Sequence, residues 1–91
     1  MNENIQNEVI ERFKARHFLF NTMHIQELNL AFKPNNTLDI VIKMGHGHNT
    51  DKDRDALAVF FAATLGLQFD FTFYIIEIDT YEEKNKLVRI E

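Results

Sequence analysis

A short polar segment near the middle of the chain carries the residues best suited to chemistry. His46 and His48 flank a glycine, and Asp51 follows three positions later. Imidazole nitrogens and carboxylate oxygens bind divalent metals such as zinc, so these three residues could in principle hold one ion. The alternative is a solvated loop that leads into a helix. We favour the loop and therefore predict no metal there.

Alternating acidic residues follow at Asp51, Asp53 and Asp55, and they begin like a calcium-binding loop. Such a loop needs glycine at its sixth position and an acid at its twelfth, where this chain has Ala56 and Ala62. The pattern is therefore no EF-hand. Acidic residues at this point instead suit the positive N-terminal end of a helix, and the preceding threonine is a good N-cap.

Two further histidines, His17 and His24, flank a short apolar stretch, and either could act as a base near neutral pH. The chain has no serine and no cysteine, which excludes a serine triad, a thiolate nucleophile, a disulfide and a cysteine-based zinc site. We therefore expect both histidines to be ordinary surface residues.

Phenylalanines alternate at Phe69, Phe71 and Phe73, opposite Asp70 and Thr72. Such a row could stack on nucleic-acid bases, or it could be the buried face of a strand. The net charge of −4 argues against binding to phosphates, which requires Lys and Arg. We predict core packing and no nucleic-acid partner.

Hydrophobic spacing predicts the elements that position these residues. Apolar residues three or four apart indicate a helix over residues 4–16, and a second helix that begins near Asp51 and ends before Gly66. Period-two alternation indicates strands. They cover residues 28–32, 38–42, 69–75 and 87–90, with a Pro-Asn turn joining the first two.

This order, α-β-β-α-β-β over residues 1–91, predicts a single small two-layer α+β domain. Its sheet should be mainly antiparallel, with the two helices on one face. The residues expected to be mostly buried are Ile5, Val9, Phe13, Leu30, Ile40, Ile42, Leu57, Phe60, Phe61, Phe71, Phe73 and Ile75.

The N-terminus is acidic and has no apolar run after it, so we expect no signal peptide. The longest apolar runs, such as residues 56–63, fall well short of the roughly 20 residues that cross a membrane. We predict no membrane partner, and together with the lack of cysteine we expect a cytoplasmic location.

Four stretches resemble the C-terminal domain of phenylacetate-CoA ligase-type adenylate-forming enzymes. They are the helical segment at residues 5–11, the hairpin at 25–42, the helix at 57–67 that ends in Leu-Gly, and the final strands at 74–79 and 85–89. The resemblance covers most of the chain. It departs from the family at Asn85, where glycine is usual.

This resemblance implies a lid-like domain that is inactive without a large nucleotide-binding adenylation domain. Lys86 matches the family's closing lysine, whose ammonium stabilises charge that develops between the carboxylate and the α-phosphate. ATP and CoA are implied for a complete ligase. We expect this chain alone to bind no cofactor and to catalyse nothing.

A second hypothesis is a small ligand-binding or protein-interaction domain with no catalytic role. An open sheet can dimerise by pairing its edges, and a fold of this kind does not determine function. In that case Lys86 and Arg89 are charges that protect an edge strand from unwanted pairing.

Overall fold

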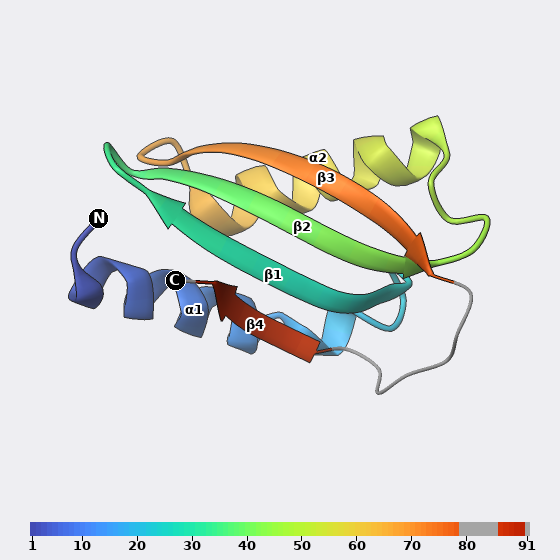
Figure 1. Cartoon of the computed structure of the whole chain (residues 1–91), viewed down its shortest axis with the longest axis horizontal. Coiled ribbons are helices and arrows are strands. Elements are labelled where there is room, and N and C mark those ends of the chain that lie inside the picture. Colours follow the sequence, from blue (N-terminus) through green and yellow to red (C-terminus); the bar gives the residue numbers. More distant parts are fainter. Residues whose placement is uncertain (79–85, 91) are drawn as a thin grey trace.

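The computed structural model describes residues 1–78 and the backbone of residues 86–90. The confirmed α-β-β-α-β-β order is visible in Figure 1. Within these residues the structure adds one short 3-10 turn, η1. The elements are α1 (Glu3–Ala15), η1 (His17–Leu19), β1 (Ile25–Lys33), β2 (Thr37–Gly45), α2 (Asp51–Leu65), β3 (Asp70–Ile78) and β4 (Lys86–Ile90).

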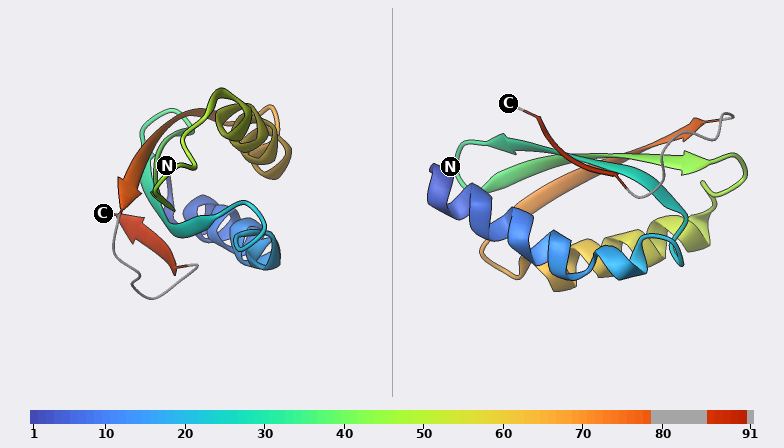
Figure 2. Two further views of the ribbon diagram at one scale, coloured as in Figure 1. Left: turned by 90° about the vertical axis from the view of Figure 1, so that its right-hand side faces the viewer. Right: turned by 90° about the horizontal axis from the view of Figure 1, so that it is seen from below.

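The elements form two layers, as the sequence predicts. Figure 2 shows α1 and α2 against the same face of the sheet, and no helix of the described residues covers the opposite face, which we call the open face. Among these residues neither helix is long and apolar enough to cross a bilayer. The α+β class with two helices on one face is confirmed.

The sheet itself differs from the mainly antiparallel one that we expected. Its strand order is β3-β2-β1-β4, and only the β1–β2 hairpin is antiparallel. β3 runs parallel to β2, and β4 runs parallel to β1. The reason is that α2 crosses over between β2 and β3 and returns the chain to the same end of the sheet, which makes the two strands parallel.

Local sequence explains where these elements begin and turn. The Asn2 side chain caps α1 by accepting a hydrogen bond from the Ile5 N–H at 2.9 Å. Pro34, Asn35 and Asn36 make the turn between β1 and β2, and both asparagines have positive φ angles, of 62° and 55°. Asparagine tolerates this left-handed conformation better than most residues do, so the predicted turn forms.

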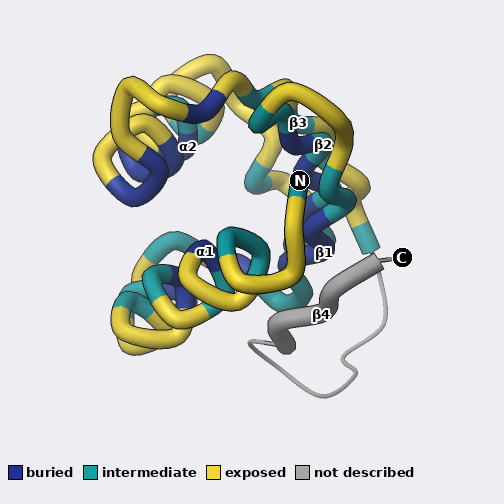
Figure 3. Tube along the Cα trace, turned by 90° about the vertical axis from the view of Figure 1, so that its left-hand side faces the viewer, coloured by how far each residue is buried: buried dark blue, intermediate teal, exposed yellow. Residues whose placement is uncertain are grey.

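The core lies between the helices and the sheet, where buried residues from both layers meet (Figure 3). Most of the predicted core is buried, but Ile5, Phe71, Phe73 and Ile75 are only partly covered. The last three lie on β3, at the end of the sheet, where they have a strand neighbour on one side only. The buried apolar residues are Val9, Phe13, Phe20, Ile25, Leu28, Leu30, Leu38, Ile40, Ile42, Met44, Leu57, Phe60, Phe61, Leu65 and Phe69.

Phe61 of α2 joins both layers. Its ring lies 6.1 Å from that of Phe13 on α1, and 5.9 and 5.4 Å from those of Phe71 and Phe73 on β3. All three pairs are edge-to-face, the geometry that aromatic quadrupoles favour. Phe61 therefore fixes α1, α2 and β3 relative to one another.

Truncating Phe61 to alanine should lower the free energy of unfolding by about 3–5 kcal/mol, because a fully buried ring leaves a cavity. Val59 lies on the same helix and is 70% exposed, so Val59→Ala is the matched control and should stay within about 0.5 kcal/mol of the parent. Urea denaturation measures both. Equal stability of the two variants would contradict the core described above.

Candidate functional site

The polar segment after β2 lies at one end of the sheet, beside the start of β1 and the end of β3. The imidazole of His48 stacks on that of His24, with ring centroids 3.8 Å apart and an angle of 10° between the planes. His46 Nδ1 lies 3.4 Å from Glu77 Oε2 at the end of β3. The fold thus brings together His24 and His48, which are far apart in the sequence.

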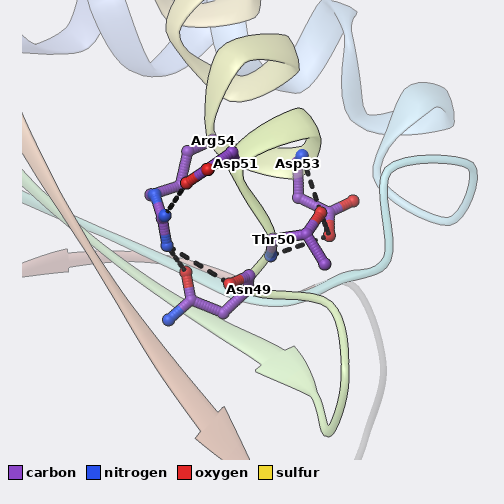
Figure 4. Close-up of polar contacts among 5 residues, drawn as sticks. All are labelled: Asn49, Thr50, Asp51, Asp53 and Arg54. Atoms are coloured by element: carbon purple, nitrogen blue, oxygen red, sulfur yellow. Dashed lines mark hydrogen bonds and ion pairs between the residues drawn. The ribbon is translucent and has the colours of Figure 1, made fainter.

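These contacts do not assemble the metal triad of His46, His48 and Asp51. The His48 ring stacks on His24, and because nitrogen lone pairs lie in the ring plane, two parallel rings do not aim at one ion. His46 faces Glu77, and Asp51 forms an ion pair with Arg54 (Figure 4). Among the described residues no group of three or more His, Cys, Asp or Glu residues could hold a metal.

The alternating acids belong to the start of α2 instead. Thr50 and Asp53 form a capping box: the Asp53 N–H donates to Thr50 Oγ1 at 3.2 Å, and the Thr50 N–H donates to Asp53 Oδ2 at 3.1 Å. Arg54 donates hydrogen bonds to the side-chain and backbone oxygens of Asn49, at 2.8 and 3.2 Å (Figure 4). The helix start predicted near Asp51 is confirmed.

The capping box also alters the acidity of Asp53. A hydrogen bond from the Thr50 hydroxyl, 2.7 Å from Oδ2, lowers the pKa of Asp53, and the Thr50 backbone N–H lowers it further. The nearby imidazoles of His48 and His24 act in the same direction. The carboxylate form of Asp53 is therefore the one that caps the helix.

The remaining histidines, His17 and His24, make contacts within the fold. His17 packs on Phe20 with a ring separation of 4.9 Å. His24 has a positive φ of 61°, a conformation that few residues other than glycine adopt, and its N–H donates to the Asn21 carbonyl. The His24–His48 stack lies over this turn. Beside it, Gln26 Oε1 is buried without a hydrogen-bond partner among the described residues.

The phenylalanine row at Phe69, Phe71 and Phe73 packs with the core. Phe71 and Phe73 contact Phe61 of α2 on the helix-covered face of the sheet. Phe69 is buried, with the Arg12 guanidinium 5.7 Å from its ring centroid. The prediction of core packing is confirmed.

Lys86 is the first residue of β4 and pairs with Glu27 of β1, at the edge of the sheet opposite β3. Side chains beyond Ile78 lie outside the described residues, as do residues 79–85. The role that the resemblance implies for the Lys86 ammonium therefore stays a prediction.

Sequence reasoning suggested pairing through a sheet edge but did not identify the strand, and the structure gives β3 an outer edge. The Asp70 N–H donates to the Asn36 carbonyl beside β2 at 3.0 Å. Because backbone groups alternate in direction along a strand, the even-numbered residues of β3 face β2. The N–H and C=O groups of Phe71, Phe73, Ile75 and Glu77 therefore point away from the sheet. No strand of the described residues pairs with them.

No family model, curated protein or solved structure matches this chain.

Replacing Thr50 with alanine should lower the free energy of unfolding by about 1 kcal/mol near neutral pH, since the cap is lost. The pKa of Asp53 is lowered from 3.8 in the folded state, so its contribution is complete above that pH and disappears as the pH falls through the lowered pKa. The difference between parent and Thr50→Ala should therefore narrow in acid.

Urea denaturation at a series of pH values tests this, with the exposed Asp55→Asn on the same helix as the control. A difference between parent and Thr50→Ala that is constant down to strongly acidic pH would contradict the capping role of the Asp53 carboxylate.

Proposed function

We propose that this chain is a non-catalytic interaction domain that binds an extended partner strand along the outer edge of β3. The observation that carries the proposal is the row of backbone donors and acceptors on that edge, at Phe71, Phe73, Ile75 and Glu77. Addition of a strand to an open sheet edge is a common mode of recognition. Its main-chain hydrogen bonds supply affinity, and alternate side chains supply specificity.

The composition of β3 supports this proposal. Natural proteins protect an exposed edge with lysine, proline, a bulge or a short strand. β3 has nine residues, contains no lysine, proline or glycine, and pairs with β2 without an irregularity. Its two charged residues, Asp70 and Glu77, lie near its ends. The edge is therefore long, regular and unprotected.

The opposite edge of the sheet gives the contrast. β4 has five residues, and two of them are Lys86 and Arg89. A short strand with positive charges has the composition that discourages pairing. Of the two edges, the β3 edge is the one suited to binding.

The open face beside this edge carries exposed apolar side chains. Tyr74 and Ile76 are 52% and 45% exposed, and Tyr74 is adjacent to Val41 of β2. Polar contacts lie farther from the edge, where Lys43 Nζ is 3.0 Å from Glu27 Oε2. A partner strand on β3 would cover apolar surface without separating this ion pair.

The proposal can be tested with random linear peptides selected by phage display against the folded chain. Bound peptides should shift and protect the amides of Phe71, Phe73 and Ile75 in ¹H–¹⁵N spectra. The variant designed to prevent binding is Glu77→Pro. It removes an outward N–H that the sheet does not use, so it should keep the parental fold. Binding should be lost or strongly weakened in this variant.

Ile76→Pro is the matched variant, because its N–H points toward β2. It should lower the melting temperature far more than Glu77→Pro does, since it removes a hydrogen bond of the ladder. The proposal fails if the outward amides of β3 respond neither to any selected peptide nor to a higher concentration of the chain itself.

A second candidate function is the lid-like C-terminal domain of an acyl-CoA ligase, working with a separate large adenylation domain. Its support is the position of Lys86 at the start of the last strand, the place of the closing lysine in the family that the sequence resembles. In that reading the lysine would serve the acyl-adenylate site of the other domain, where ATP and CoA bind.

Pyrophosphate exchange by a candidate adenylation domain, measured with and without this chain, tests the second candidate. The chain should raise the rate, and Lys86→Ala should abolish the increase while its stability stays within about 0.5 kcal/mol of the parent, as for other surface changes. Equal rates with parent and Lys86→Ala would eliminate this function. Arg89→Ala is the control on the same strand.

A further inference from the structure

We propose that the strand bound by β3 is the β3 of a second copy of this chain, running antiparallel, with the two-fold axis at Tyr74. The inference rests on the proposed function and specifies its partner. The result is one continuous sheet across the dimer, with the helices of both copies on the same face.

The outward backbone groups are arranged symmetrically for such a pairing. Phe71 and Phe73 lie three and one positions before Tyr74, and Ile75 and Glu77 lie one and three positions after it. An axis at Tyr74 therefore sets Phe73 opposite Ile75 of the second copy, and Phe71 opposite Glu77. Every outward residue gains a partner, and the seam forms about eight hydrogen bonds, two from each close pair.

Moving the two-fold axis to a neighbouring residue loses part of this ladder of hydrogen bonds between the two β3 strands. With the axis at Ile75, Phe71 would lie opposite residue 79, beyond the end of β3. With the axis at Phe73, Glu77 would lie opposite Phe69, before its start. The axis at Tyr74 is the register that uses the whole strand.

Side chains also match in this register. On the open face Tyr74 lies opposite its own copy, and Thr72 lies opposite Ile76. Aromatic pairs are among the favourable cross-strand neighbours, and β-branched residues such as Thr72 and Ile76 pack well in strands. Tyr74 and Ile76, which are half-exposed in the single chain, would be covered by these neighbours.

Charge selects the antiparallel direction. Asp70 and Glu77 are the charged residues of β3. Antiparallel pairing sets Asp70 opposite Ile78, and Glu77 opposite Phe71. The side chains of Asp70 and Glu77 also lie on opposite faces of the sheet, because side chains alternate along a strand and the two residues are an odd number of positions apart. A parallel pairing in register would bring each carboxylate beside its own copy, which is destabilising.

The core gives an independent reason for a second copy to bind here. Phe71, Phe73 and Ile75 face the helices but are only partly buried, since β3 ends the sheet. In the dimer each of them gains an opposite residue on the same face, and the apolar layer beneath the two sheets becomes continuous across the seam.

Sedimentation velocity over a concentration series tests the dimer. The chain should move from its monomer mass of 10.8 kDa to twice that value as its concentration rises. Tyr74→Lys and Tyr74→Glu should each remain monomeric, because each places like charges opposite one another at the axis. A mixture of the two variants should restore the dimer, since opposite charges then meet. Val59→Lys, at an exposed site on α2, should dimerise like the parent.

Cysteine cross-linking tests the register, because the chain contains no other cysteine. Residues at a non-hydrogen-bonded position such as Tyr74 have Cα atoms about 4.5 Å apart across the seam, within the roughly 4.4–6.8 Å of a disulfide. Tyr74→Cys should cross-link under mild oxidation. Thr72→Cys and Ile76→Cys should each cross-link poorly alone and efficiently when mixed. Val59→Cys sets the background of random collisions.

Two results would overturn the inference: a monomer at every concentration, or Thr72→Cys alone cross-linking as well as Tyr74→Cys. If the chain stays monomeric while selected peptides still protect the outward amides, β3 binds strands but not its own copy, and the proposed function survives. If those amides respond neither to peptides nor to concentration, both proposals fail together.

Discussion

The rest of the structure depends on the parallel pairing of β2 and β3, which the α2 crossover imposes. Phe61 holds that crossover in place by contacting Phe13 on α1 and both Phe71 and Phe73 on β3. β4 does not lie beside β3 but at the far side of the sheet, where it pairs with β1. Within the described strands, the outer edge of β3 therefore has no neighbour.

The two edge strands of the sheet, β3 and β4, consequently differ in what they can bind. The β4 edge is short and carries Lys86 and Arg89. The β3 edge presents nine regular residues and has apolar side chains beside it on the open face. The histidines at the end of the sheet serve the structure through the His24–His48 stack and the His46–Glu77 contact. In the described part of the chain, the outward backbone groups of β3 have no strand partner.

Much of this fold could be predicted from local patterns, because those patterns report local physics. Thr50 and Asp53 mark the start of α2, and the two asparagines mark the hairpin turn. Alternation identifies the core face of β1, β2 and β3. The order of the strands could not be predicted, since Phe71 and Phe73 alternate identically in a central strand and in an edge strand. The His24–His48 stack depends on the same long-range arrangement. The sequence favoured a loop over a metal site at His46, His48 and Asp51, and within the described residues Asp51 pairs with Arg54, three positions later on α2.

Amide hydrogen exchange along β3, resolved by residue and measured on the dilute chain, tests this account most directly. The amides of Thr72, Tyr74 and Ile76 face β2 and should exchange slowly, while those of Phe71, Phe73 and Ile75 face outward and should exchange fast. This alternation would establish both the parallel pairing with β2 and the free outer edge. Slow exchange at both sets in dilute solution would mean that another part of the chain already covers the edge. Fast exchange at both sets would mean that β3 does not pair with β2.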